Sequence, residues 1–296
     1  MSLPNFMCIG AAKSGTTSLY DILKKHSNVF IPSFKEPHFF DSPTVYKNGI
    51  KWYESTYFKG VRNETCIGDF TASYLFEQKS AERIYNDLGK DVKFIVILRN
   101  PVDRAYSHYL HAKRDLHEKE SFSKALMLEK DRLIEARKQS DYLLELRNSY
   151  IGQGFYHTML TQFFAFFPKE NFLILHFEED FIKNRKESMN KIYSFLKIND
   201  EGIDFNIKSN PAAQARLTWL KQLMKKTGFW RTIIKKMIPS LKVRQIIKNR
   251  VQRANISSFT AEELTVAVKK EIYNTYFADQ IVLLEQLLNK QMYWNK

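Results

Sequence analysis

The stretch that decides the fold is "NFMCIGAAKSGTTSLYDIL" at residues 5–23. Its first residues form an apolar run, which predicts a buried strand over residues 5–10. A loop of small residues follows, and the apolar spacing after it predicts a helix over residues 15–26. A strand that passes through a glycine-containing loop into a helix is typical of sheets that bind anions beyond their strand ends.

The loop has the chemistry of a phosphate site. Gly10 and Gly15 let the backbone curve closely around an anion, and the helix directs free N–H groups at it. The candidate binding residues are Lys13, Ser14, Gly15, Thr16, Thr17 and Ser18. A Walker loop, G-x-x-x-x-G-K-[ST], has lysine where this chain has Thr16, so the pattern disfavours an ordinary ATPase or GTPase. An ordinary strand-to-helix turn is the simpler alternative for this loop taken alone.

Further apolar runs alternate with helical patterns along the chain. The other predicted strands are "TCIGDF" at 65–70, "KFIVILR" at 93–99 and "NFLILHF" at 171–177. Pro101 is placed to begin a helix, and "RKESMNKIYSFLKI" at 185–198 is helical in pattern. This alternation predicts an α/β protein, a three-layer fold with a central parallel sheet flanked by helices. Residues 1–296 are expected to form one domain with a helical C-terminal region.

The positive charge of the chain is concentrated in one segment. Of 46 Lys and Arg against 32 Asp and Glu, thirteen basic and no acidic residues fall within residues 205–261. The remainder then holds 46 − 13 = 33 basic and 32 acidic residues, a balance of +1. The segment is expected to be mostly helical and to contact an anionic partner.

Composition bounds the cellular setting. The sequence contains no apolar run of the length of about 18 residues that a membrane-spanning helix needs. Cys8 and Cys66 are too few for a disulfide framework, so both are expected to be reduced core residues. The seven histidines show no metal-ligand spacing, and no metal is expected. These features predict a cytoplasmic protein, with peripheral membrane contact as an option.

A second anion site is predicted from "LRNPVDRAYSHY" at residues 98–109. Arg99 ends a strand and Ser107 lies on the next helix, so both could donate to one phosphate, with Arg104 as a third donor nearby. Taken singly, each of these residues could equally belong to a salt-bridged strand end or a solvated helix face.

Together the two stretches resemble the nucleotide-binding signatures of sulfotransferases that use 3′-phosphoadenosine 5′-phosphosulfate (PAPS), which have a P-loop NTPase-like fold. "KEPHFFD" at 35–41 and "GDFTASYL" at 68–75 resemble segments of the branch that contains heparan sulfate N- and 3-O-sulfotransferases and bacterial relatives. That branch has a lysine where this chain has Phe70, so any role of that lysine is missing here.

The resemblance implies the chemistry of the site. Lys13 would stabilise the leaving group, the loop would hold the 5′-phosphosulfate, and Arg99 and Ser107 would hold the 3′-phosphate. Glu36 would be the general base, with His38 as its main rival and Lys35 as a neighbour that could tune it. Asp69, Thr71 and Tyr156 could shape the cleft, with burial in the core as the equal alternative for Tyr156. The implied reaction moves a sulfonyl group from PAPS to a hydroxyl or amine, most readily of a glycan, and releases adenosine 3′,5′-bisphosphate (PAP).

Two other classes of function stay open at this point. A small-molecule kinase of the P-loop class would bind Mg-ATP, although the absent Walker lysine disfavours it. A nucleic-acid-binding protein would use the basic segment, although the sequence has no recognisable motif for it. The interleaved basic and apolar residues at 219–253 could instead lie on an anionic membrane or line an acceptor groove, or be a helical subdomain with a solvated basic face.

Overall fold

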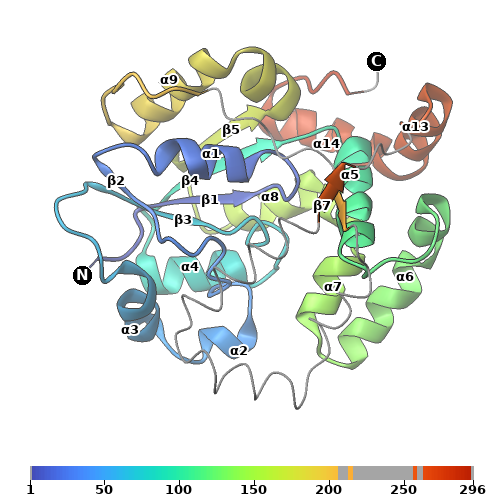
Figure 1. Cartoon of the computed structure of the whole chain (residues 1–296), viewed down its shortest axis with the longest axis horizontal. Coiled ribbons are helices and arrows are strands. Elements are labelled where there is room, and N and C mark those ends of the chain that lie inside the picture. The colour runs from blue at the N-terminus through green and yellow to red at the C-terminus, as the bar shows by residue number, and fades with distance from the viewer. Residues whose placement is uncertain (1, 206–212, 216–255, 259–262, 295–296) are drawn as a thin grey trace. The chain divides into compact units, whose positions relative to one another are not determined.

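The computed structural model describes residues 2–205, 213–215, 256–258 and 263–294 (Figure 1). Its contacts divide the chain into two compact units. The larger unit comprises Met1–His108, Leu126–Ser209 and Leu264–Lys296, and the smaller comprises Tyr109–Ala125 and Asn210–Glu263. All of the candidate site residues belong to the larger unit.

The larger unit is built on a parallel sheet of five strands in the order β2-β3-β1-β4-β5. The strands are β1 (Phe6–Gly10), β2 (Val29–Phe30), β3 (Cys66–Phe70), β4 (Lys93–Leu98) and β5 (Phe172–His176). β1 lies between β3 and β4 at the centre of the sheet, and all its residues are buried. The predicted α/β fold with a central parallel sheet is therefore confirmed.

Helices cover both faces of this sheet (Figure 1). The α-helices in the part of the chain that the structure describes are α1 (Thr16–Leu23), α2 (Pro43–Tyr46), α3 (Ile50–Tyr53), α4 (Ser80–Leu88), α5 (Pro101–Arg114), α6 (Phe122–Lys138), α7 (Tyr142–Asn148), α8 (Tyr156–Phe164), α9 (Arg185–Leu196), α13 (Val266–Ile272) and α14 (Ala278–Leu288). Short π-helical turns occur at Glu54–Phe58, Phe177–Lys183 and Tyr273–Phe277, and short 3-10 turns at Gly152–Gly154 and Lys169–Asn171.

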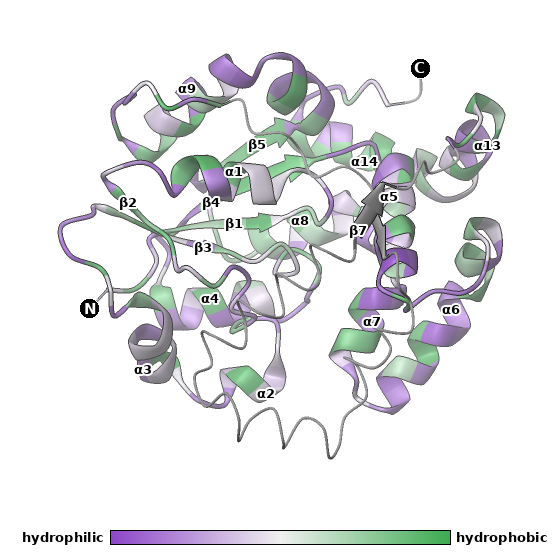
Figure 2. Cartoon of the chain, viewed as in Figure 1, coloured by the Kyte–Doolittle hydropathy of each residue, from purple (hydrophilic) through white to green (hydrophobic). Residues whose placement is uncertain are grey.

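Alternation along the strands assigns side chains to the two faces of the sheet. Cys8, Ile95, Ile97 and Leu175 are buried in one core with apolar residues of α1 and α9. On the other face Phe94 packs edge-to-face against Phe163 of α8, with ring centroids 5.6 Å apart. The strands are accordingly apolar along their length, whereas the covering helices alternate apolar and polar residues (Figure 2).

Several details differ from the sequence-based expectation. β2 is only two residues long, too short to give an apolar run, and was not predicted. The helix expected over residues 15–26 ends at Leu23, and Lys24 and His26 then bond backbone carbonyls of its last turn. Cys8 and Cys66 are buried and free, as expected of core thiols.

Most of the basic segment at 205–261 lies outside the described residues, as does the stretch 219–253. Within the segment, β6 (Ala213–Ala215) and β7 (Ile256–Ser258) form an antiparallel pair in the smaller unit, which the sequence did not predict. Among the helices that the structure describes, none is both long enough and apolar enough to cross a bilayer.

Candidate functional site

Backbone hydrogen bonds join three of the sequence motifs at the carboxyl edge of the sheet. The loop after β1 bonds to β4 from Ala11 N to Ile97 O at 2.8 Å. The Glu36 segment bonds to the last residue of β3, from Glu36 N to Phe70 O at 3.1 Å. The segment after β3 returns to β1, from Leu75 N to Ile9 O at 3.0 Å. The predicted motifs therefore meet at the edge where open α/β sheets bind ligands.

The loop after β1 adopts a conformation that favours glycine at its end. Gly15 has φ 85° and ψ 6°, which is the left-handed region, and a Cβ built there would lie 2.9 Å from the Phe177 ring. Lys13 also has a positive φ, 70°, so the loop holds its lysine in a rarely populated backbone state. Such strained residues concentrate at ligand sites, where the surrounding structure holds them.

The start of α1 is open to an anion. Within the described chain, no side chain caps this helix, and its first turn holds no acidic residue. Its first N–H groups therefore lack helical partners, as at any helix start. Ser14 is fully buried, and its Oγ has no hydrogen-bond partner among the residues that the structure describes. Thr16 is buried, Ser18 is half-buried and Thr17 is exposed. A buried hydroxyl and a bare helix start are both suited to phosphate oxygens.

Arg99 connects the two predicted halves of the site. Its Nη1 donates to the carbonyl of Lys13 at 3.0 Å, so the guanidinium lies against the loop. Its planar group stacks over the Phe177 ring, 4.9 Å from the centroid. Its Nε is buried without a partner in the described part of the chain. The residue thus retains an unused donor beside the loop, which suits a second phosphate group.

The other residues of the second motif are placed differently from one another. Ser107 is half-buried on α5, two turns after the end of β4. Arg104 is fully buried and donates from Nη2 to the carbonyl of Tyr150, and burial lowers the pKa of its guanidinium. Tyr156 is also buried, and its hydroxyl donates to the carbonyl of Arg99 at 2.9 Å. Tyr156 therefore supports the end of β4, and Arg104 belongs to the protein interior.

The "KEPHFFD" segment carries both candidate bases on strained backbone. Glu36 has φ 62° and His38 has φ 53°. The Glu36 side chain is 38% exposed, and its Oε1 lies 2.7 Å from Nζ of Lys35. Phe39 and Phe40 are fully buried and pack against the ring of Tyr53. The paired phenylalanines thus anchor the segment while Glu36 stays accessible to solvent.

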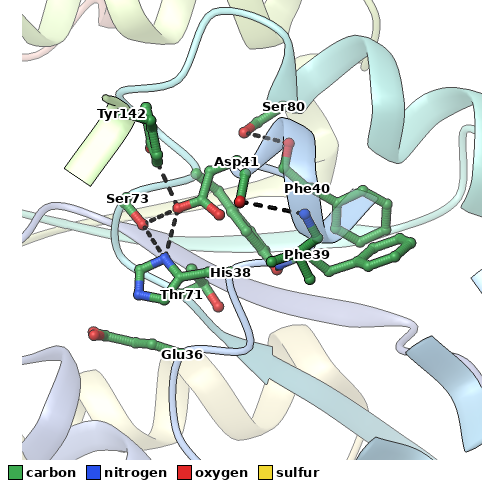
Figure 3. A network of polar contacts seen from close by, with 12 residues as sticks. Glu36, His38, Phe39, Phe40, Asp41, Thr71, Ser73, Ser80 and Tyr142 are labelled. Atoms are coloured by element: carbon green, nitrogen blue, oxygen red, sulfur yellow. Dashed lines mark hydrogen bonds and ion pairs between the residues drawn. The ribbon is translucent and has the colours of Figure 1, made fainter. Parts of the chain in front are cut away.

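His38 belongs to a polar network that is shown in Figure 3. Its Nδ1 lies 2.8 Å from Oδ2 of Asp41, which is fully buried, and 3.3 Å from Oγ of Ser73. Ser73 and Tyr142 also donate to Oδ2 of Asp41, Tyr142 at 3.2 Å. Burial lowers the pKa of His38, but the hydrogen bond and the charge of Asp41 outweigh burial and raise it above the usual value.

A second buried carboxylate, Asp69, lies one residue before the end of β3. Its oxygens accept hydrogen bonds from the hydroxyls of Thr71 at 2.6 Å, Tyr74 at 2.9 Å and Tyr53. Burial raises the pKa of Asp69 to about 6, against the opposing effect of these donors. The next residue, Phe70, is buried and packs edge-to-face against Phe6 and Tyr20. Its side chain therefore belongs to the core and takes no part in the polar site.

The sequence did not single out every member of these networks. Asp41 and Ser73 lie inside motifs that were recognised. Asp41 is three residues from His38, whereas the hydrogen bond from Ser73 to Asp41 depends on the packing of segments 32 residues apart. Tyr142 had no signal at all, because it begins a short helix 101 residues after Asp41. Only the folded chain brings these three side chains to one point.

Comparisons with known proteins agree with one another. A family model described as the sulfotransferase domain matches residues 3–248. The human bifunctional heparan sulfate N-deacetylase/N-sulfotransferase 2 is 32% identical over 66% of this chain and 22% of its own length. Mouse carbohydrate sulfotransferase 15 is 27% identical over 72% of this chain and 47% of its own length. A crystal structure of a sulfotransferase from Alicyclobacillus acidocaldarius matches with a TM-score of 0.70 and 25% identity, and covers all of both chains. The chain thus spans less than half the length of these two curated relatives.

Proposed function

The chain belongs to the sulfotransferase-domain family, and on that premise we propose that it transfers a sulfonyl group from PAPS to an acceptor. Family membership confirms the predicted relationship and the class of enzyme, since the family model matches residues 3–248. The proposed donor, the roles of single residues and the acceptor go beyond that membership. The observation that carries the proposal is the junction of Arg99 with the loop at the carbonyl of Lys13.

The loop and the second motif supply donors that fit PAPS. Ser14 has a buried hydroxyl without a described partner, and Arg99 has an unused Nε. We assign the 5′-phosphosulfate to the loop and the start of α1, from Lys13 to Ser18, and the 3′-phosphate to Arg99 and Ser107. Two anionic groups on one ligand need two such donor sets, and the bond from Arg99 to the carbonyl of Lys13 supports this assignment.

When bound, PAPS would supply an activated sulfonyl group and a phosphate leaving group. The chain's own residues then have to position two reactants, neutralise charge and accept a proton. Lys13 would supply positive charge to stabilise the anion that develops on the leaving group. The helix start and the hydroxyls of Thr16 and Thr17 would hold the anionic oxygens of PAPS.

We propose Glu36 as the group that removes the acceptor's proton. Its carboxylate is 38% exposed at the carboxyl edge of the sheet, so an acceptor hydroxyl or amine can approach it. His38 is the rival base. Burial lowers its pKa, but the hydrogen bond and charge of Asp41 raise it above the usual value, which strengthens the imidazole as a hydrogen-bond donor. We therefore propose that Glu36 acts as the base and that His38 donates a hydrogen bond to the acceptor substrate or to a sulfonyl oxygen.

We propose a glycan as the acceptor, O- or N-sulfated. The support is the character of the relatives, which include enzymes whose names specify heparan sulfate and carbohydrate substrates. The basic stretch at 219–253, outside the described residues, is the candidate contact for an anionic glycan or a membrane surface. A cytoplasmic location agrees with the two free buried cysteines, since reduced thiols persist in that compartment.

Calorimetry with PAP and with Mg-ATP tests this proposal. We expect PAP to bind far more tightly, and Arg99→Ala to weaken it by roughly 10- to 100-fold, the value of a hydrogen bond to a charged group. Lys25→Ala, an exposed lysine just after α1, is the matched control and should leave affinity unchanged. A preference for Mg-ATP would support the kinase alternative. Tight, salt-dependent DNA or RNA binding without affinity for PAP would support a nucleic-acid-binding protein.

A further inference from the structure

The His38 network contains a residue that no motif of the sequence accounts for. Tyr142 is the first residue of α7, and its hydroxyl lies 3.2 Å from Oδ2 of Asp41 (Figure 3). Oδ2 is the same oxygen that lies 2.8 Å from Nδ1 of His38. The tyrosine therefore reaches the candidate site through its hydrogen bond to Asp41. We infer that Tyr142 is a positioning residue, whose hydroxyl fixes Asp41 and thereby the orientation and tautomer of the His38 imidazole.

The first step of the argument is the geometry of Asp41. The carboxylate is fully buried, and its Oδ2 is hydrogen-bonded to His38, Ser73 and Tyr142. The other oxygen, Oδ1, is buried without a hydrogen-bond partner in the described part of the chain. All of the hydrogen bonding that holds the carboxylate therefore converges on the oxygen that faces His38. Three donors at one oxygen leave the side chain little freedom to rotate away from the imidazole.

The second step is the direction of the Tyr142 hydrogen bond. Burial and the negative charge of Asp41 raise the pKa of the Tyr142 hydroxyl, so it keeps its proton and acts as the donor. Ser73 donates to the same oxygen, which leaves the proton on Nδ1 of His38 to complete the set. The remaining ring nitrogen, Nε2, then points away from Asp41 (Figure 3). This arrangement fixes one nitrogen to the protein and leaves the other for a ligand.

The third step is the charge that surrounds His38. Asp41, Glu36 and Asp69 all act on the imidazole and favour its protonated form, and Lys35 is the cation that pairs with Glu36. Asp41 contributes most of the three because it also makes the hydrogen bond. A donor such as Tyr142 spreads the negative charge of Asp41 and so moderates its pull on the histidine proton. Removal of the hydroxyl should therefore raise the pKa of His38, whereas removal of the Asp41 charge should lower it.

NMR titration of the His38 imidazole in the full-length chain, without nucleotide or acceptor, tests the inference. Tyr142→Phe removes one oxygen atom, and we expect the His38 pKa to rise relative to wild type. Asp41→Asn should lower it. Tyr85→Phe is the matched control, since Tyr85 is 41% exposed and packs its ring against Phe166 and Phe167. An unchanged His38 titration in a folded Tyr142→Phe variant would overturn the inference. Should that variant fail to fold, Tyr142→Met removes the same donor and carries the same expectation.

The catalytic consequence rests on the proposed function, whereas the titration does not. With PAPS and an acceptor, Tyr142→Phe should lower kcat by roughly three- to tenfold and shift the pH profile in the direction of the NMR change, because the hydrogen bond it removes acts through a charged group. PAP affinity should stay unchanged, since Tyr142 is not among the phosphate donors. A kcat loss without any shift of the profile would indicate a merely structural role. If no acceptor is sulfated by the wild type, the proposed function fails, and the titration still decides the role of Tyr142.

Discussion

Glu36 and His38 lie two residues apart, both at positive φ, and single substitutions separate their proposed roles. We expect Glu36→Gln to lower kcat by about 100-fold or more, the usual contribution of a general base. The nucleotide contacts proposed for the loop, Arg99 and Ser107 do not involve Glu36, so PAP affinity should be retained. Initial rates with labelled PAPS and calorimetry with PAP measure the two quantities separately.

The control for this substitution is Glu82→Gln, an exposed glutamate on α4, which should leave both quantities unchanged. If Glu36→Gln loses PAP affinity as strongly as turnover, Glu36 holds the nucleotide or the fold and does not act as the base. If it retains turnover, His38 becomes the better candidate despite its raised pKa.

Asp69 predicts a pH-dependent stability. Its folded pKa of about 6 exceeds the value of about 3.9 in an unfolded chain, so the native state binds more protons between these values. Stability from this group is therefore present at low pH and is lost as the pH rises toward 6. Urea unfolding should show that the free energy of unfolding of Asp69→Asn rises relative to that of wild type, by on the order of 2 kcal/mol between pH 4.5 and 7.

The measured quantity is the difference in unfolding free energy between the variant and wild type at each pH. The contributions of the other titrating groups are the same in both proteins and cancel. Asp69 accepts hydrogen bonds from three hydroxyls, and the substitution also carries the cost of weakening them. If that cost is constant, it shifts the difference in unfolding free energy equally at every pH and does not change its slope with pH. A flat difference for Asp69→Asn would mean that Asp69 is ionised normally in the folded protein.

At the scale of elements, the connection between β1 and α1 depends on Gly15. An alanine there would combine a positive φ of 85° with a Cβ 2.9 Å from the Phe177 ring. We expect Gly15→Ala to destabilise the protein by about 1–3 kcal/mol and to weaken PAP binding, because the loop and the start of α1 must shift together. Thermal unfolding and calorimetry measure the two effects.

Gly202→Ala separates backbone strain from the steric clash. Gly202 also has a positive φ, 66°, but a Cβ there meets nothing within 4 Å. Gly202→Ala should therefore show only a modest loss of stability and a normal affinity for PAP. Equal effects of the two substitutions on affinity would mean that contact with Phe177 does not shape the nucleotide loop.

The long strands and their connections were predictable because each is an apolar run with its own local signal. β4 and β5 were placed to within a residue or two, and the loop motif identified the start of α1. β2 was missed because two residues carry no periodicity, and its place beside β3 is set by pairing with Cys66 and Ile67. The order of strands likewise depends on contacts between segments that are distant in the sequence.

Some residues of the candidate site were likewise predictable from local motifs, and others were not. Lys13, Arg99 and Glu36 were proposed from motifs, and the structure joins their segments through bonds such as Arg99 Nη1 to Lys13 O. Their roles remain predictions. Tyr142 could not be found from the sequence, because its connection to Asp41 spans 101 residues and no local pattern marks it. Arg104, which the motif suggested as a third phosphate donor, lies in the interior and donates to Tyr150.

At the scale of the whole molecule, the net charge of +14 is almost entirely that of residues 205–261. A balanced remainder gives little attraction to polyanions, so electrostatic binding to an anionic glycan or membrane should depend on this segment. We predict that the double variant Lys235→Ser/Lys236→Ser weakens binding to an anionic polysaccharide and reduces the steepness of its salt dependence by about two charges. Binding isotherms at several salt concentrations measure both effects.

Lys183→Ser/Lys191→Ser removes the same charge from the balanced part of the chain, where both lysines pair with acidic residues. This control should change the salt dependence little, because each lysine already neutralises a carboxylate. Anionic vesicles substituted for the polysaccharide distinguish the two partners, since a membrane-binding segment also inserts apolar side chains and retains affinity at high salt. Equal losses in both double variants would mean that net charge alone governs binding, and the basic segment would then have no special part in holding the acceptor.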